Sequence, residues 1–154
     1  MLRFLTLFAC FISVNIHADD FKPATDTQKP EDRPPTPQEA LEIITVPEGF
    51  HVDLFAAEPD VRQPLDMKFD ARGRMWVVES YSYDGHKFAE GIDDRILIFE
   101  DTDRDGKFDK RTVFWDKANR LTSLEFAPGG IYVLNAAELQ FIPDADGDDV
   151  PDGP

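Results

Sequence analysis

The sequence predicts an all-β fold, made of the first blade and most of the second blade of a β-propeller. Three observations predict this fold: short apolar runs, Gly and Pro residues between them, and an internal repeat of about four strands. The chain has 154 residues, and its 12 Pro and 9 Gly argue against a protein of long helices. A signal peptide, a Pro-rich linker and a short helix are expected before the first strand.

Residues 1–18 have the layout of a secretory signal peptide. Arg3 gives a positive start, residues 4–16 form an apolar run, and Ala18 offers a small residue at the cleavage point. The alternative, a retained membrane anchor, is disfavoured because so short a run does not span a hydrocarbon core about 30 Å thick. We therefore expect an exported chain, periplasmic or at the cell surface, with no transmembrane helix after cleavage. Cleavage would also remove Cys10, the single cysteine, which suits an oxidising compartment.

Residues 19–45 are expected to form a Pro-rich linker that ends in a short helix. Thr36, Pro37 and Glu39 match a capping box, with Thr36 as the N-cap and Glu39 reaching back to it. This pattern predicts a helix that runs to about Ile44.

From residue 46 to residue 154 the pattern predicts the start of a propeller domain. Phe50, Val52 and Leu54 alternate with polar residues, which is typical of a strand. A second alternating set, Leu65, Met67 and Phe69, has Asp66 and Lys68 on the opposite face. Residues 75–78 and 96–99 are continuous apolar runs, as expected of strands covered on both faces. Further strands are predicted at residues 112–115, 124–126, 131–134 and 139–142.

Two blocks of the sequence occur twice, in the same order. Residues 69–77 are echoed by residues 126–133, and residues 95–105 are echoed by residues 138–148. Chance similarity between hairpins is the alternative, but the shared order favours a repeat. One unit reads as strand, turn, strand, variable loop, strand, Asp-rich loop and strand, which is the arrangement of a propeller blade of about 40–60 residues. Because a propeller closes with about 4–8 blades, we expect the chain to be the N-terminal part of a longer protein.

Asp-rich loops are the strongest chemical signal, and they predict Ca²⁺ sites. The first loop has carboxylates at positions 1, 3, 5 and 9 and a backbone carbonyl at position 7, as in an EF-hand loop. The second loop keeps positions 1, 3, 5 and 9 but has Asp149 where a Gly is expected, and it resembles the Asp-rich calcium repeats of thrombospondin-type proteins. The predicted ligands are Asp101, Asp103, Asp105, Lys107, Asp109, Asp144, Asp146, Asp148 and Asp152. The alternative is a pair of metal-free Asx turns, since Thr112 stands where an EF-hand has its bidentate Glu.

No complete catalytic constellation is visible in the sequence. His86, in the variable loop at residues 79–94, is a candidate general base or substrate-binding residue. The alternative for His86 is a solvent-exposed loop residue. His51 is expected at the surface, and Trp76 and Trp115 are expected in the core.

The charge of the chain argues against a nucleic-acid partner. Asp and Glu number 31 against 16 Lys and Arg, a formal charge of −15. A protein binds a phosphate backbone by neutralising it with Lys and Arg, so this balance points away from nucleic acids.

Four segments resemble the bacterial membrane-bound dehydrogenase family that has an N-terminal β-propeller. They read VPEGFHVDLFAAEP at residues 46–59, FDARGRMWVVESY at 69–81, DRILIFEDTD at 94–103 and FIPDADGD at 141–148. This family is similar to the quinone-dependent glucose and sorbosone dehydrogenases, and its longer members carry a C-terminal c-type haem domain. The resemblance implies oxidation of a sugar or alcohol, an electron-acceptor domain downstream, and pyrroloquinoline quinone and haem c in the full-length protein. A non-catalytic, Ca²⁺-stabilised propeller that binds carbohydrate or protein at the cell surface is the alternative.

Overall fold

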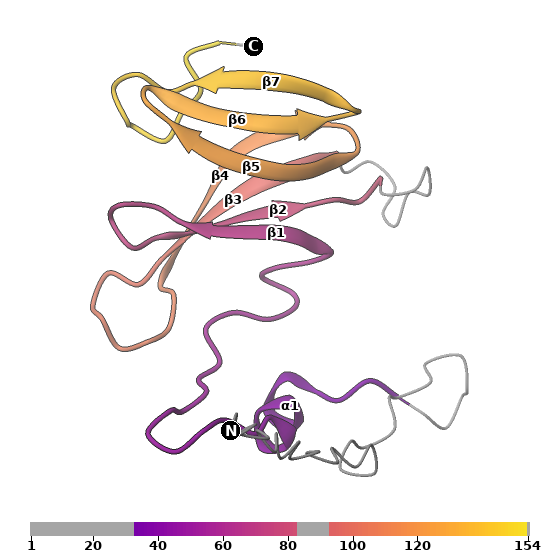
Figure 1. The fold of residues 1–154 in the computed structure, drawn as a ribbon, viewed down its shortest axis with the longest axis vertical. Helices are drawn as coiled ribbons and strands as arrows, with labels where there is room; N and C mark the ends of the chain where they lie inside the picture. Colours follow the sequence, from indigo (N-terminus) through magenta and orange to yellow (C-terminus); the bar gives the residue numbers. More distant parts are fainter. Residues whose placement is uncertain (1–32, 83–92, 154) are drawn as a thin grey trace, which may run out of the picture. The chain divides into compact units, whose positions relative to one another are not determined.

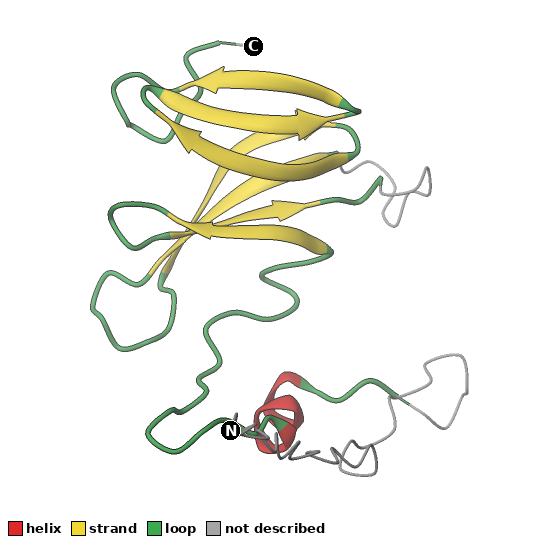
Figure 2. Cartoon of the chain, in the orientation of Figure 1, coloured by secondary structure: helices red, strands yellow, loops and turns green. Residues whose placement is uncertain are grey.

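The computed structural model describes residues 33–82 and 93–153, and Thr36–Pro154 forms one compact unit. Its regular structure is one short helix and two antiparallel sheets (Figures 1 and 2), so the all-β prediction is confirmed. The predicted signal peptide and His86 lie outside the described residues.

Helix α1 spans Pro37–Ile43 and confirms the predicted capping box. The Thr36 hydroxyl accepts a hydrogen bond from the Glu39 N–H at 3.3 Å, and the Thr36 N–H donates to the Glu39 carboxylate at 2.7 Å. These two bonds satisfy backbone N–H groups that the first turn of a helix leaves without partners.

The two sheets are formed from strands that follow one another along the chain. Sheet A has the order β1-β2-β3-β4 and sheet B the order β5-β6-β7. The strands are β1 Pro64–Phe69, β2 Met75–Glu79, β3 Asp94–Glu100, β4 Lys110–Ala118, β5 Leu121–Ala127, β6 Gly130–Asn135 and β7 Glu138–Pro143. All of the strands predicted after residue 60 are therefore present.

The strand predicted around Phe50, Val52 and Leu54 is wrong. These residues belong to no strand, and Phe50 is 72% exposed. Alternation alone does not make a strand, because a strand also needs a neighbouring edge for its backbone hydrogen bonds, and among the described residues none pairs with this segment.

The main core lies between the two sheets. Sheet A contributes Trp76, Val78, Ile96, Ile98 and Phe114, and sheet B contributes Leu121, Leu124, Ile131, Val133 and Ile142. A second cluster covers the opposite face of sheet A, where Phe55, Val61 and Phe108 pack on Met75, Val77, Leu97 and Phe99. Strands β2 and β3 are thus covered on both faces, as their continuous apolar runs predict, and Trp76 is in the core, only 4% exposed.

Strand β1 exposes its apolar residues and turns its polar residues inward, the reverse of what is usual for an alternating strand. Its apolar residues Leu65, Met67 and Phe69 are 42%, 54% and 60% exposed, while Asp66 and Lys68 are half-buried. The polar residues point towards sheet B, where Asp66 Oδ2 accepts from the Leu124 N–H at 3.1 Å and Lys68 pairs with Glu125 at 3.0 Å. These polar contacts between the sheets fix the orientation of β1.

Gly130 is required where β6 passes β7. Its φ is +155°, and a Cβ at this position would collide with the carbonyl oxygen of Ile142. We expect Gly130→Ala to lower the free energy of unfolding by about 1–3 kcal/mol, because overpacking forces the backbone to shift.

Gly129→Ala is the matched control for this prediction. Gly129 has φ +76° but no atom within 4 Å of an added Cβ, so only the left-handed backbone penalty of about 1 kcal/mol remains. Equal losses for the two variants in urea unfolding would contradict the proposed collision.

The connections between strands divide between two ends of the sheets (Figure 1). Because neighbouring strands are antiparallel, the β1–β2 turn, the β3–β4 loop, the β5–β6 turn and the loop after β7 lie at one end. The end of β2 and the start of β3 lie at the other end, with the β4–β5 and β6–β7 turns. Both Asp-rich loops therefore share one end.

Candidate functional site

The first Asp-rich loop connects β3 to β4 and is ordered by its own carboxylates. Asp101 Oδ1 accepts from the Arg104 N–H at 2.6 Å, and Asp101 Oδ2 accepts from the Gly106 N–H at 2.9 Å. Asp109 closes the loop, since its N–H donates to the Glu100 carbonyl at 3.0 Å. Hydrogen bonds from Thr102 hold the pKa of Asp109 below its ordinary value of 3.8, so this carboxylate is ionised at neutral pH.

The second Asp-rich loop, after β7, has four of the same hydrogen bonds to its carboxylates, 43 residues later. In both loops the fifth residue donates its N–H to the first and third carboxylates, the seventh N–H donates to the fifth carboxylate, and the second N–H donates to the ninth. In the first loop these bonds are Asp105 to Asp101 and Asp103 (both 3.2 Å), Lys107 to Asp105 (2.8 Å) and Thr102 to Asp109 (3.0 Å). In the second loop they are Asp148 to Asp144 (3.1 Å) and Asp146 (3.4 Å), Val150 to Asp148 (2.9 Å) and Ala145 to Asp152 (2.6 Å).

The backbone conformations of the two loops also agree. The fourth residue has a positive φ in each loop, 64° at Arg104 and 71° at Gly147. The sixth residue does too, with 88° at Gly106 and 69° at Asp149. A loop with Asp at the sixth position thus adopts the same path as a loop with Gly, because Asp tolerates the left-handed region better than most residues.

Each loop gathers three carboxylates whose oxygens lie within 4.8 Å of one another. The groups are Asp101, Asp103 and Asp109 in the first loop, and Asp144, Asp146 and Asp148 in the second. The predicted ligands Asp105 and Asp152 lie in the same loops but outside these two groups, and Lys107 is exposed beside Asp105. Hard carboxylate oxygens in a tight loop are the ligand type that Ca²⁺ takes, so the donor set fits that ion.

Asp149 has a role that the sequence pattern did not reveal. Its Oδ2 accepts from Arg74 Nη1 at 2.6 Å and its Oδ1 from Arg74 Nη2 at 2.9 Å, a bidentate pair. The side chain of Arg74 is only 4% exposed. Its Nε also donates to Asp70 Oδ2 at 2.8 Å. The second Asp-rich loop is thereby tied to the β1–β2 turn of sheet A.

The pKa values of both carboxylates reflect this arginine. The hydrogen bonds from Arg74 hold the pKa of Asp149 below its ordinary value of 3.8. Burial by itself raises the pKa of Asp70, but hydrogen bonds from Arg74 and Trp76 outweigh burial and lower it. The signal in the sequence was the single departure from the loop pattern, an Asp where a Gly is expected.

A buried carboxylate, Asp94, lies at the opposite end of the sheets. It accepts five hydrogen bonds: from the Tyr81 N–H (2.6 Å), the Ser82 N–H (2.9 Å), the Ser80 and Ser82 hydroxyls (3.0 and 2.8 Å) and the Leu121 N–H (2.8 Å). Asp94 thus holds both ends of the 80–93 connection and joins sheet A to the first residue of β5.

Glu79 is a second buried carboxylate at this end. It accepts from the Arg62 N–H at 2.6 Å, from the Tyr81 hydroxyl at 2.9 Å and from Arg95 Nε at 2.5 Å. Burial raises the pKa of Tyr81, and its hydrogen bond to Glu79 adds to the effect. Glu79 and Tyr81 fall within residues 79–94, where the variable loop was predicted, but both are buried.

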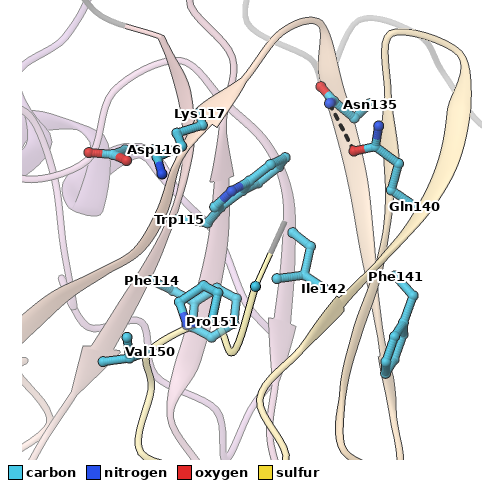
Figure 3. A pocket seen from close by; sticks show the side chains of 11 residues that line it. Phe114, Trp115, Asp116, Lys117, Asn135, Gln140, Phe141, Ile142, Val150 and Pro151 are labelled. Atoms are coloured by element: carbon cyan, nitrogen blue, oxygen red, sulfur yellow. Dashed lines mark hydrogen bonds between the residues drawn. The ribbon is translucent and has the colours of Figure 1, made fainter.

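A groove of about 960 Å³ lies between β4 and β7, the outer strands of the two sheets (Figure 3). Phe114, Trp115, Ile142 and Pro151 give it apolar walls. Asn135 Nδ2 donates to Gln140 Oε1 at 3.1 Å on one side, with both side chains fixed by the bond. Trp115 is half-buried here and packs against the core, as predicted.

Catalytic groups do not converge within residues 33–82 and 93–153. His51 is at the surface, as predicted, with its side chain 84% exposed and Nε2 2.9 Å from Asp53. The buried carboxylates at the other end are fully hydrogen-bonded within the protein. The described residues therefore offer clustered carboxylates and structural ion pairs, and no set of acid, base and nucleophile.

The fold and its loops define a class: an antiparallel two-sheet protein with a repeated Asp-rich loop at one end. The chain belongs to the family described as "Domain of unknown function (DUF7133)", whose model matches residues 36–153. Comparisons with curated proteins and with solved structures found no match. Among the described residues, no helix has both the length and the hydrophobicity to cross a membrane.

Proposed function

We propose that the chain is part of a β-propeller whose Asp-rich loops bind Ca²⁺ and thereby stabilise the blades. One observation carries the proposal: the two loops, 43 residues apart, share the same carboxylate positions and the same hydrogen bonds. In this proposal sheet A is one blade and sheet B is most of the next.

The repeat of strands supports the blade assignment. In sheet A, the strand that follows the Asp-rich loop is β4, and it pairs with β3. The equivalent position in sheet B is the outer edge of β7, where the described residues supply no further strand and which borders the groove beside Trp115. A fourth strand at this edge would complete a four-stranded blade.

The clustered charge supports Ca²⁺. Three carboxylates within 4.8 Å of one another repel unless a cation lies among them. A ligand that binds only the folded state stabilises it, by about 2.7 kcal/mol when its concentration is 100 times its Kd. Ca²⁺ at about 10 mM reaches this ratio for a Kd of about 10⁻⁴ M, which is ordinary for extracellular modules.

We expect Ca²⁺ to raise the melting temperature of the purified chain. At about 10 mM Ca²⁺ the melting temperature is expected to be roughly 5–10 °C higher than in chelator. This is the shift that an added stability of about 2.7 kcal/mol gives in a domain of this size. Asp103→Asn removes a carboxylate from the first cluster and should reduce the rise. Asp116→Asn, an exposed carboxylate on β4, is the control and should leave the rise intact.

Thermal unfolding followed by circular dichroism at matched ionic strength is the measurement. A melting curve that is the same in Ca²⁺ and in chelator would contradict the metal sites. An equal rise with Mg²⁺ would show an effect of charge screening rather than of a Ca²⁺ site.

The resemblance to the membrane-bound dehydrogenase family supports a wider proposal, in which this propeller is the N-terminal part of an exported dehydrogenase of sugars or alcohols. The 154 residues contain no Cys-x-x-Cys-His motif, so a haem c would be held by other sequence. The test is dye-linked oxidation of a panel of sugars and alcohols by full-length protein with pyrroloquinoline quinone and Ca²⁺. No turnover across the panel would contradict it.

The non-catalytic alternative, a propeller that binds carbohydrate or protein at the cell surface, has one observation in its favour. Among the described residues, the buried acids near the 80–93 connection are engaged in structural hydrogen bonds. Binding of immobilised glycans by full-length protein that turns over none of the panel would favour this alternative.

A further inference from the structure

The two Asp-rich loops share a backbone path but differ in the residue at the sixth position. This residue has a positive φ in both loops, 88° at Gly106 and 69° at Asp149. Glycine adopts such a conformation at no steric cost, because it has no Cβ. Asp tolerates the conformation better than most residues, but its Cβ still approaches the neighbouring backbone. The first loop therefore keeps its path unaided, whereas the second loop needs support from outside.

Arg74, beside the β1–β2 turn of sheet A, supplies this support. Its two Nη atoms donate to the Asp149 carboxylate at 2.6 and 2.9 Å. The side chains of Arg74 and Asp149 are only 4% and 13% exposed. The guanidinium is itself held in place, because Nε donates to Asp70 Oδ2 at 2.8 Å. A buried bidentate pair of this kind fixes both the distance and the orientation of its partners.

The residue that Arg74 holds lies inside the second carboxylate cluster. Asp149 directly follows Asp148, one of the three clustered carboxylates. The residue after it, Val150, donates its N–H to Asp148 Oδ1 at 2.9 Å. A change in the φ of Asp149 would move Val150 relative to Asp148 and break this bond. The conformation that Arg74 supports is thus also the one that orients the Asp148 carboxylate.

Within residues 33–82 and 93–153, the first loop has no equivalent of this tie. A Cβ at Gly106 would meet no atom within 4 Å. The first loop packs instead through Phe108, whose ring centroid lies 4.9 Å from that of Phe99 and 6.1 Å from that of Phe55. Phe99 belongs to β3 and Phe55 to the segment before β1. The chain therefore contains two versions of one loop, and only the second is fastened to the other sheet.

We infer that Arg74 is a positioning residue for the second Ca²⁺ site, and that this site binds tightly only when sheet B is packed against sheet A. The inference rests on the proposed Ca²⁺ sites and adds to them a coupling between the metal and the packing of the sheets. Because such a coupling is reciprocal, Ca²⁺ in the second loop strengthens the contact between the sheets. Ca²⁺ in the first loop stabilises sheet A without affecting that contact.

Calorimetric titration of Ca²⁺ into the purified chain tests the inference, with each loop measured by itself. Asp103→Asn disables the first loop and leaves the second to be measured, while Asp146→Asn does the reverse. Arg74→Met is compared with Arg72→Met in both backgrounds. Arg72 is the matched control, because it also donates to Asp149, at 3.0 Å, but its side chain is 57% exposed.

We expect Arg74→Met to weaken Ca²⁺ binding by the second loop roughly tenfold, the effect of losing a residue that orients a metal ligand. Removal of a positive charge beside the site would by itself tighten the binding of a cation. A positioning role and a purely electrostatic role therefore predict opposite signs. Arg72→Met should change the Kd of the second loop by no more than about threefold, and the first loop should keep its Kd in both variants.

A double variant separates the conformation of the backbone from the ion pair. Arg74→Met with Asp149→Gly removes one charge of each sign, so the net charge near the second loop is unchanged. The double variant also gives the second loop the glycine of the first. The Kd of the second loop should return to within about threefold of its unaltered value, because glycine adopts the positive φ without support.

Circular dichroism in Ca²⁺ checks that each variant is folded, and Arg74→Lys takes the place of Arg74→Met if the latter unfolds. Lysine keeps the positive charge but does not form the bidentate pair. Arg74→Lys should therefore also weaken the second loop and leave the first unchanged.

Three results would overturn the inference. These are a second loop that Arg74→Met leaves unchanged or tightens, an equal weakening of both loops, and a double variant that stays weak. In each of these cases the proposed Ca²⁺ sites stand, since the unaltered chain still binds the ion. A chain in which neither loop binds Ca²⁺ would overturn the sites and the coupling together.

Discussion

Replacing Asp94 with alanine is expected to lower the free energy of unfolding by about 3–5 kcal/mol, because the change leaves buried donors without an acceptor. Asp94 is completely buried and accepts five hydrogen bonds. Two of the donors are backbone N–H groups just after β2, and a third is the Leu121 N–H in sheet B. The loss therefore affects both the base of a loop and the contact between the sheets.

Urea unfolding measures this effect, with Asp93→Ala as the matched control. Asp93 is adjacent in sequence but exposed, and a surface substitution of this kind usually changes stability by no more than about 0.5 kcal/mol. Asp94→Asn keeps the size of the side chain but replaces one acceptor oxygen with a donor, so it too should be strongly destabilising. A stable Asp94→Asn variant would show that Asp94 does not act through its hydrogen bonds.

Replacing Arg74 with methionine is the second large prediction, with an expected loss of about 3–5 kcal/mol. Methionine fills much of the same space but leaves the carboxylates of Asp70 and Asp149 without their main partner. Arg72→Met is the control, because Arg72 also donates to Asp149, at 3.0 Å, but its side chain is 57% exposed. An exposed ion pair contributes about 1 kcal/mol or less, so the two arginine variants should differ clearly.

The same arginine gives stability a defined dependence on pH. The folded protein holds the pKa values of Asp70 and Asp149 below their ordinary value of 3.8. A carboxylate whose pKa is lowered by folding adds stability above the ordinary value, and that stability is lost as pH falls through the lower value of the folded state. Unfolding of the unaltered chain should therefore become easier below about pH 4, and Arg74→Met should lack this part of the loss. Parallel pH profiles for the two proteins would contradict the role of the ion pair.

The strands and the helix could be predicted because their signals are local. A capping box at Thr36 and Glu39 satisfies backbone N–H groups at the start of α1 with bonds between residues three apart. The continuous apolar runs of β2 and β3 can be recognised in the sequence without knowing which strands they pair with. The repeat of the Asp-rich loops was also visible, since a loop that bonds to its own carboxylates needs no other part of the chain.

What the sequence did not reveal depends on contacts between distant segments. The direction of β1 is set by Asp66 and Lys68, whose partners in β5 are 58 and 57 residues away, respectively. Asp149 looked like an irregular Gly position because its partner, Arg74, lies 75 residues earlier. The alternation of Phe50, Val52 and Leu54 gives no sign of whether a sheet edge is available. In each case the local sequence is compatible with more than one structure, and only the tertiary contacts decide which one forms.

The five hydrogen bonds that Asp94 accepts have a consequence for which parts of the sequence can vary. They fix the point where the connection leaves β2 and the point where it enters β3, whatever the length of sequence between them. The bonds to Asp94 involve only residues 80–82 and Leu121, and the carboxylate clusters lie at the far end of the sheets. Proteins that differ from this one only in the sequence between Ser82 and Asp94 should therefore keep both the two-sheet arrangement and the Asp-rich loops.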